Sequence, residues 1–173
     1  MLIADTPRLR LRWFTADDAA FILGLLNDPD WIRNIGNRHV HTEDDARGWL
    51  QQRLMANYWK QGIGFWAVER LEDGALMGMC GLIHRDGLPD PDVGYAFMPA
   101  FRGQGYAREA VRAALAHGRR LGIRRILAIV SPDNQASRQL LLDVGLSERG
   151  MTRLPGGDED LVLFSDEATM PAA

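Results

Sequence analysis

The segment VGYAFMPAFRGQGYAREAVRAALAHGRRLG, residues 93–122, combines a short apolar run, a glycine-bearing loop and a long amphipathic stretch. The run from Val93 to Phe97 predicts a strand that ends before Pro99, because proline lacks the N–H that a continuing ladder needs. Small and apolar residues then recur three and four positions apart from Ala107 to Leu121, and Gly122 supplies a C-terminal stop. The segment therefore predicts a strand that is joined to a helix by a loop.

The loop between this strand and this helix has the composition of an anion-binding site. Gly103 and Gly105 let the backbone turn tightly just before the helix, where the first N–H groups lack helical acceptors and the helix dipole favours negative charge. Residues 102–125 contain seven Arg and a single acidic residue, Glu109, in a chain whose net charge is −3. The pattern predicts a phosphate group at this loop; a solvated basic helix face is the alternative that stays open.

Two common phosphate-binding motifs do not fit this loop. A dinucleotide fingerprint needs a third small residue three positions after Gly105, where this sequence has Arg108. A Walker loop needs a lysine before Ser or Thr, and the single lysine of the chain is Lys60. The ligand is therefore neither a dinucleotide bound in the Rossmann manner nor ATP or GTP bound by a Walker loop.

The rest of the chain predicts an α+β domain. Apolar runs and two-residue alternation predict strands at residues 8–14, 65–70, 76–83, 125–130 and 160–164. Helical spacing predicts helices from Thr15 to about residue 27, over residues 43–61 and over residues 134–144. Residues 27–42 read as a polar connection and residues 168–173 as a frayed tail. No linker or repeat divides the chain, so we expect a single domain over residues 1–173, with a mixed sheet and helices on its faces.

Composition limits the partners that can be expected. The net charge of −3 provides no overall positive field for nucleic acid or for an anionic membrane, and no apolar run approaches the roughly 20 residues of a membrane span. The lone cysteine, Cys80, fits a reducing compartment, and the N-terminus does not read as a secretory signal. We therefore expect a cytoplasmic protein without nucleic-acid, membrane or metal partners, and a homodimer is left open.

Three parts of the sequence together resemble one known family. Arg102-Gly103-Gln104-Gly105-Tyr106-Ala107 is similar to the (Gln/Arg)-x-x-Gly-x-(Gly/Ala) acyl-CoA loop of the GCN5-related N-acetyltransferases (GNATs), and it follows a strand as in that family. Residues 131–146, which include Asn134 and Ser137, resemble the end of the following strand and the next helix of that family. Residues 6–12 are similar to the opening of the ribosomal-protein (RimJ/RimL-like) branch. The resemblance covers about residues 6–165.

The resemblance implies a fold and an acetyl-CoA site. A GNAT fold has a mixed, mostly antiparallel central sheet of about six or seven strands, splayed between strands four and five, and about four flanking helices. The pantetheine arm of acetyl-CoA would enter the splay, with the pyrophosphate on the loop. The residues implied for cofactor binding are Tyr95, Phe97, Met98, Arg102, Gly103, Gln104, Gly105, Tyr106, Ala107, Asn134 and Ser137.

The resemblance also implies direct attack of a neutral amine on the acetyl carbonyl, without a covalent enzyme intermediate. Many relatives donate a proton to the sulfur from a Tyr seven positions after the Asn, but this sequence has Leu141 there. This departure leaves Ser137, or a water held by Asn134, as the proton source. Asp92 is the first candidate for general base, followed by Asp90 and His84, and Asp92 can equally be read as a turn residue.

Acceptor selection is expected on the N-terminal helices and the loop that joins them. The candidate substrate-binding residues are Trp31, Asn34, Arg38 and His39. Because the base is weak, an amine of low pKa is easier to serve, so we expect a protein or peptide N-terminus or a small-molecule amine as acceptor. The alternative function is a catalytically weak acyl-CoA-binding sensor or interaction module, which the leucine at residue 141 would suit.

Overall fold

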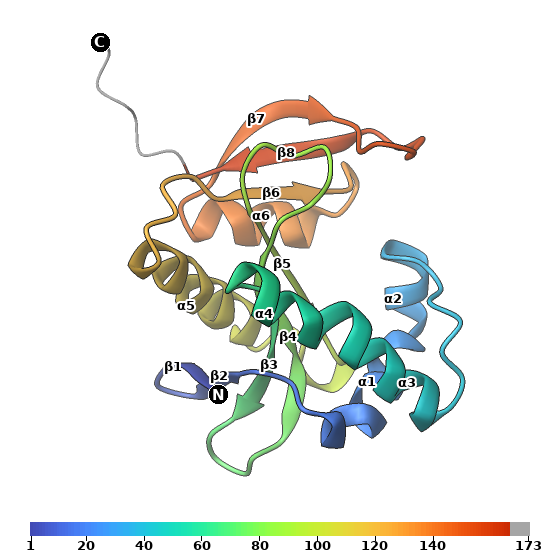
Figure 1. Cartoon of the computed structure of the whole chain (residues 1–173). Helices are drawn as coiled ribbons and strands as arrows, with labels where there is room; N and C mark the ends of the chain where they lie inside the picture. The colour runs from blue at the N-terminus through green and yellow to red at the C-terminus, as the bar shows by residue number, and fades with distance from the viewer. Residues whose placement is uncertain (167–173) are drawn as a thin grey trace.

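A computed structural model of the chain describes residues 1–166, in which helices cover both faces of a single sheet (Figure 1). The strands are β1 (Leu2–Asp5), β2 (Leu9–Arg12), β3 (Phe65–Arg70), β4 (Leu76–Ile83), β5 (Asp92–Phe97), β6 (Leu127–Val130), β7 (Ser147–Thr152) and β8 (Leu161–Ser165). The helices are α1 (Ala19–Leu26), α2 (Pro29–Asn34), α3 (Glu43–Trp49), α4 (Ala56–Gln61), α5 (Tyr106–Arg120) and α6 (Gln135–Asp143). The mixed α+β architecture expected from the sequence is confirmed. The predicted tail at residues 168–173 lies outside the described residues.

The described strands form one eight-stranded sheet in the order β1-β2-β3-β4-β5-β6-β8-β7. All neighbouring strands are antiparallel except β5 and β6. The expected count of six or seven strands was too low, because β1 and β7 were not predicted. Both are edge strands whose side chains are largely exposed, so neither carries the alternation that marks a half-buried strand. Each also has an irregular register, between Leu2 and Ala4 in β1 and between Glu148 and Met151 in β7.

Strands β5 and β6 separate almost as soon as they meet, which confirms the expected splay. They pair at the single position Asp92 with Leu127, where the N–H of Leu127 donates to the carbonyl of Pro91 at 2.9 Å. Beyond this point β5 runs downwards in the view of Figure 1, while β6 lies above it. A backbone edge of β5 is thereby left without a partner among the described strands.

Two of the N-terminal helices, α2 and α3, begin at side-chain caps. Thr42 and Asp45 form a capping box at the start of α3, and a π-helical segment (Leu50–Met55) continues α3 into α4 until Gly62, as the predicted helix over residues 43–61 requires. Helix α2 was not predicted, since residues 27–42 read as a polar connection. It forms because Asp28 accepts a hydrogen bond from the Trp31 N–H at 3.2 Å and a proline occupies the first turn.

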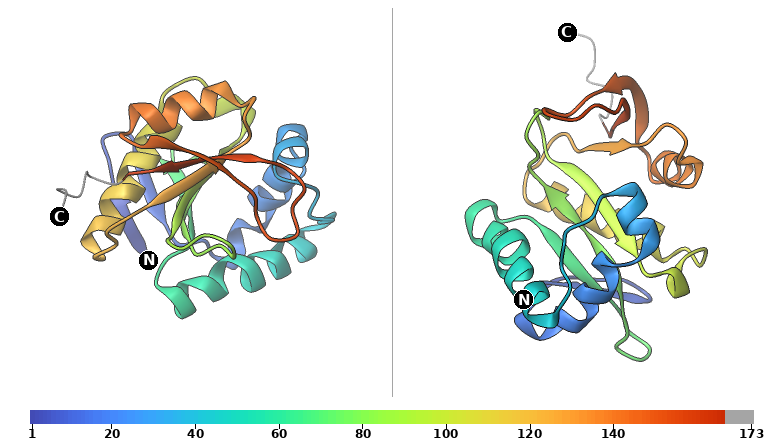
Figure 2. Two further views of the ribbon diagram at one scale, coloured as in Figure 1. Left: turned by 90° about the horizontal axis from the view of Figure 1, so that it is seen from above. Right: turned by 90° about the vertical axis from the view of Figure 1, so that its right-hand side faces the viewer.

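Two apolar cores hold helices against the two faces of the sheet (Figure 2). Residues of α5 and α6 pack on one face around Trp66 and Phe164. Residues of α1, α3 and the π-helical segment pack on the other face around Phe14 and Met79. Helix α5 therefore lies on one face of the sheet, and α1 and α3 lie on the other. The loop before α5 meets the start of α2 beyond the end of β5, where Arg102 contacts Asp28.

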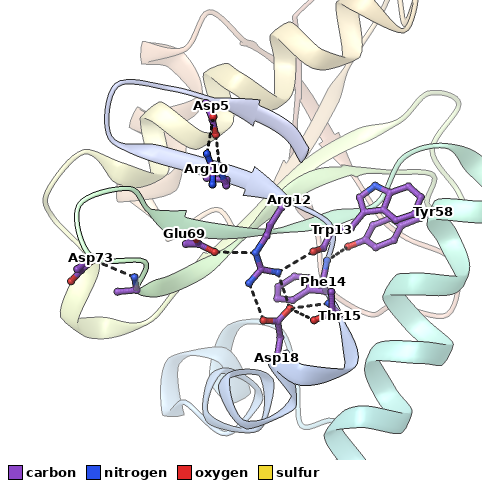
Figure 3. A network of polar contacts seen from close by, with 11 residues as sticks. Asp5, Arg10, Arg12, Trp13, Phe14, Thr15, Asp18, Tyr58, Glu69 and Asp73 are labelled. Carbon is purple, nitrogen blue, oxygen red and sulfur yellow. Dashed lines mark hydrogen bonds and ion pairs between the residues drawn. The ribbon is translucent and has the colours of Figure 1, made fainter. Parts of the chain in front are cut away.

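Arg12 at the end of β2 is the centre of a polar network that joins the sheet to the first helix (Figure 3). Its Nη1 and Nη2 donate to the two carboxylate oxygens of Asp18 at 2.9 Å, and its Nε donates to Glu69 of β3 at 2.9 Å. The Asp18 carboxylate also accepts from the Thr15 N–H at 2.8 Å. These contacts raise the pKa of Arg12, and the hydrogen bonds that it donates to Asp18 are the largest cause, so the network contains a permanent positive charge.

Candidate active site

The loop before α5 presents a row of unsatisfied backbone donors. Gly103 and Gly105 adopt left-handed conformations with φ of +71° and +81°, which turn the chain into the helix. Among residues 1–166, the N–H groups of residues 105–108 have no hydrogen-bond acceptor. These donors lie at the positive end of a 15-residue helix. The arrangement fits an anion of phosphate size, so the residues present suit the diphosphate of a coenzyme A thioester.

Positive charge from a distant part of the chain borders this loop. The Arg8 Nη1 donates to the carbonyl of Gln104 at 3.0 Å, and the guanidinium lies over the Tyr106 ring at 4.4 Å from its centre. Glu109, the single acid of the basic segment, accepts from Thr6 Oγ1 at 2.6 Å and from Arg8 Nε at 2.7 Å. A cavity of about 590 Å³ lies here, lined by Thr6, Pro7, Arg8, Gly105, Arg108, Glu109, Arg112 and Ala113.

Other arginines of the segment brace the fold. Arg108 pairs with Asp143 at 2.5 Å and Arg112 donates to the Asp143 carbonyl at 3.2 Å, which connects α5 to the end of α6. Arg119 pairs with Asp166. The open alternative of a simple solvated basic face therefore does not describe these three side chains.

Arg102, predicted in the cofactor loop, turns its side chain towards α2. Its Nε donates to the Phe97 carbonyl at 2.9 Å, its Nη2 donates to Asp28 at 2.9 Å, and its Nη1 pairs with Asp30. Its N–H donates to the Pro99 carbonyl at 3.2 Å. Gln104 likewise uses its side chain within the loop, on the Ala100 carbonyl at 2.9 Å. The side chains of Arg102 and Gln104 are thus engaged by other parts of the protein and do not point to the free N–H groups of residues 105–108.

The open edge of β5 carries backbone groups of two predicted residues. The Met98 N–H donates to the Met77 carbonyl of β4 at 2.9 Å, so this residue faces β4. Backbone direction alternates along a strand, so the N–H and C=O groups of Tyr95 and Phe97 point the other way, towards the splay. The backbone groups of Tyr95 and the N–H of Phe97 are therefore placed to pair with an extended ligand. The Phe97 carbonyl already accepts from Arg102, and the N–H of Met98 is already used.

Helix α6 brings Asn134 and Ser137 to the same splay. Asn134 Oδ1 accepts from the Ser137 N–H at 3.1 Å and so caps the helix, while its Nδ2 has no acceptor within the described part of the chain. The Ser137 Oγ lies 2.6 Å from the Tyr95 Oη. Leu141, one turn further along, is 2% exposed and belongs to the core. The side chain of Tyr95 was not anticipated, because only spatial proximity connects it to Ser137.

Asp92 lies at the closed end of the splay and is 1% exposed. Arg85 approaches its carboxylate, with Nη2 at 3.2 Å and Nε at 3.3 Å. Burial raises the pKa of Asp92, and the Arg85 charge opposes this shift. Asp90 is held by Arg125 Nε at 2.6 Å. The environment of Asp92 therefore favours proton uptake, and its pairing with Arg85 could not be read from the sequence.

The predicted acceptor residues are gathered at α2 and the loop after it. Trp31 is 7% exposed, and its Nε1 is buried with no acceptor among residues 1–166. Asn34 ends α2, and Arg38 and His39 are exposed in the following loop, where His39 has a φ of +54°. Within the described chain, no hydrogen bond or ring contact joins these four side chains to Asp92 or Ser137.

The described residues contain no group of three or more metal-ligating side chains close enough to hold an ion. Among the same residues, no helix is both long enough and apolar enough to cross a bilayer.

Comparison with known proteins identifies this arrangement. The family model described as an acetyltransferase (GNAT) domain matches residues 8–147. The chain belongs to the GNAT acetyltransferase family. Members of this family transfer an acetyl group from acetyl-CoA to an amine, so the protein is an N-acetyltransferase.

Two curated relatives of this GNAT protein are from Bacillus subtilis strain 168. YoaA, described as an uncharacterized N-acetyltransferase, is 31% identical over 157 residues, which cover 87% of this chain and 86% of YoaA. YkkB, described as an uncharacterized protein, is 32% identical over 149 residues, which cover 82% of this chain and 83% of YkkB. These relatives support the family over nearly the full length.

Solved structures share the fold. A GNAT-family acetyltransferase from Bacillus anthracis has a TM-score of 0.77 at 25% identity, covering 95% of this chain and 97% of the other. RimL, a ribosomal α-N-protein acetyltransferase solved with coenzyme A, has a TM-score of 0.81 at 18% identity, covering 95% and 97%. The ribosomal-protein-S5-alanine acetyltransferase from Vibrio fischeri has a TM-score of 0.78 at 20% identity, covering 99% and 100%. The expected likeness to the RimJ/RimL-like branch is thus present at the level of the fold.

Proposed function

We propose that this GNAT protein acetylates a primary amine, the α-amine of a protein or peptide N-terminus or a small-molecule amine, by direct attack in a ternary complex. The observation that supports it most is the free donor row of residues 105–108 beside the open edge of β5. The N–H groups can bind an anion, and the open strand edge can pair with an extended chain. A coenzyme A thioester requires both, because it has a diphosphate and a pantetheine arm.

Residues from three elements would hold acetyl-CoA. The loop and first turn of α5 would bind the diphosphate, with Arg8 adding positive charge. The backbone groups of Tyr95 and the N–H of Phe97 would pair with the pantetheine amides along β5, and Asn134 Nδ2 would donate to the same arm from α6. Acetyl-CoA itself supplies an acetyl group activated as a thioester.

The side chains near the splay would manage charge and protons. A backbone N–H of β5 at the open edge would stabilise the negative charge that develops on the carbonyl oxygen. Ser137 would give a proton to the departing sulfur, and Asp92 would accept one from the acceptor nitrogen, directly or through water. Each role belongs to a residue that lies at the splay, between β5, β6 and α6.

Release of free coenzyme A thiol tests the function directly. Purified protein mixed with acetyl-CoA and a library of peptide and small-molecule amines is expected to release thiol in proportion to acetylated amine, as followed by mass spectrometry. The alternative, a binding module, would give saturable acetyl-CoA binding by calorimetry and no thiol with any amine.

The amine screen is expected to favour α-amines over lysine side chains. An α-amine has a pKa of about 7.7 to 8.0 and lysine about 10.4, so deprotonating lysine costs roughly 3.5 kcal/mol more at neutral pH. A base already paired with Arg85 is poorly suited to supply that difference. Two peptides of one sequence, one with a free N-terminus and blocked lysine and one the reverse, form the matched comparison. Faster acetylation of the lysine peptide would contradict the expectation.

Replacing Arg85 is expected to move the acidic limb of the pH–rate profile to higher pH. The Arg85 charge lowers the pKa of Asp92, so Arg85→Gln should raise that pKa further above its usual value. The base form is then lost at a higher pH as the solution is acidified. The kcat/KM values of the variant and the unmodified protein are compared with the same acceptor amine, so that the ionisation of the amine cancels. Arg10→Gln, which removes an exposed partner of Asp5, serves as the control. An unmoved limb would exclude Asp92 as the base.

A further inference from the structure

Two hydroxyl groups meet across the opening of the sheet. Tyr95 belongs to β5 and Ser137 to the first turn of α6, 42 positions apart, and their oxygens are 2.6 Å apart. Both residues are only partly accessible. This contact joins the strand and the helix that border the splay on either side, at the place where the thioester sulfur would lie near Ser137.

In many relatives a tyrosine seven positions after the Asn gives a proton to the sulfur, but this chain has Leu141 there. Leu141 has no titratable group, and its side chain is packed in the core with Val111 and Phe164. Tyr95 belongs to the same core cluster through its ring, but its hydroxyl reaches Ser137. A phenol therefore reaches the splay from β5, although no phenol is available at this position of α6.

We propose that Tyr95 is a positioning residue that acts through Ser137, and that the two hydroxyls form the proton relay to the departing sulfur. This inference rests on the proposed acetyl transfer. Ser137 is the catalytic residue, since its Oγ would contact the sulfur, and Tyr95 orients Ser137 and replaces its proton.

The relay balances in atoms and charge. The acceptor nitrogen forms a bond to the acetyl carbon, and the bond from that carbon to sulfur breaks. Sulfur takes the proton of Ser137 Oγ, Ser137 takes the proton of Tyr95 Oη, and Tyr95 regains a proton from water. The nitrogen loses one proton to the base and from there to solvent, so the net products are an amide and a free thiol.

The environment of Tyr95 suits a group that must hold its proton until it is needed. Burial raises the pKa of Tyr95 to about 12, although the hydrogen bond to Ser137 acts in the opposite direction. Cys80, its partner across β4 and β5, is a buried thiol whose pKa is raised by desolvation, so it stays neutral beside the phenol. The phenol is therefore protonated throughout the working pH range.

Removing the phenol oxygen tests the relay. Tyr95→Phe is expected to lower kcat about 100-fold, at the lower end of the range for general acid catalysis, while the Kd of acetyl-CoA by calorimetry changes less than about 3-fold. Ser137→Ala should lower kcat by a similar factor, and the double variant should be no slower than the slower single variant, because both changes break one chain. Tyr58→Phe, which removes another buried phenol oxygen, is the matched control and should retain kcat.

Three results would overturn the relay: kcat unchanged in Tyr95→Phe, additive losses in the double variant, or a loss of acetyl-CoA affinity as large as the loss of kcat. Absence of thiol release by the unmodified protein would instead contradict the proposed function.

A second readout does not depend on turnover. Alkaline titration of tyrosinate absorbance should show a component near pKa 12 that is absent from Tyr95→Phe. Ser137→Ala should move this component to higher pH, because the hydrogen bond between Tyr95 and Ser137 lowers the pKa of Tyr95. A component that stays in place would show that the two hydroxyls do not interact in solution.

Discussion

Gly105→Asp is expected to weaken acetyl-CoA binding about 100-fold, which corresponds to about 2.7 kcal/mol. The substitution places a carboxylate at the N-cap of α5, among the N–H groups that have no other acceptor in the described chain. An aspartate at a helix N-cap accepts hydrogen bonds from the first turn, so it would occupy the donors intended for the diphosphate. It would also repel the diphosphate and attract the Arg8 guanidinium, which lies 3.4 Å from the position of the added Cβ.

Gly122→Asp is the matched control for this prediction. Gly122 follows the other end of α5 with a φ of +83°, against +81° for Gly105, and an added Cβ would meet no atom of residues 1–166 within 4 Å. The two variants therefore share the backbone strain and the added charge, and they differ in the end of the helix. Calorimetry with acetyl-CoA should show near-normal affinity for Gly122→Asp. Equal affinity of both variants would remove the loop from the binding site.

Asp18→Ala is expected to lower the free energy of unfolding by about 3 kcal/mol, as is typical when one partner of a buried ion pair is removed. Asp18 is 7% exposed, and its loss leaves the Arg12 guanidinium without two of its bonds beside the sheet (Figure 3). The Thr15 N–H at the start of the first helical turn also loses its acceptor. Urea denaturation followed by circular dichroism measures the change.

The pair Asp5 and Arg10 provides the exposed counterpart. Its two hydrogen bonds, at 2.9 and 3.1 Å, repeat the fork geometry on the surface, so Asp5→Ala should leave the denaturation midpoint nearly unchanged. Combining Asp18→Ala with Arg12→Leu should recover part of the lost stability, because the unpaired charge is then removed as well. A double variant less stable than Asp18→Ala alone would show that the cost does not come from the unpaired charge.

The central part of the fold could be predicted because its signals are local. The strand at residues 93–97, the two glycines and the helix that follows are encoded within thirty consecutive residues. The capping box of Thr42 and Asp45 is also local, and α3 begins at Glu43, where the predicted helix over residues 43–61 begins. Patterns of this kind depend on neighbours three or four positions away, which the sequence displays directly.

The features that escaped prediction depend on neighbours far along the chain or on weak burial. Helix α2 has six residues and lies against Arg102, more than 70 positions away, so its own residues show little apolar periodicity. The Arg85 bond to Asp92 and the Tyr95 contact with Ser137 are contacts between side chains whose partners the sequence does not specify. In each case the sequence shows the residue, but the tertiary fold determines which residue it contacts.

The irregular outer strands bear on how copies of this protein meet. A flat, unpaired strand edge is a template on which another chain can add, and proteins commonly interrupt such edges to prevent aggregation. Here the register breaks in both β1 and β7, and β7 also contains Gly150 with a φ of +100°. Neither border of the sheet offers a regular ladder for continuation into a neighbour. Self-association of this enzyme would accordingly occur through its helical faces and not through the edge strands β1 and β7.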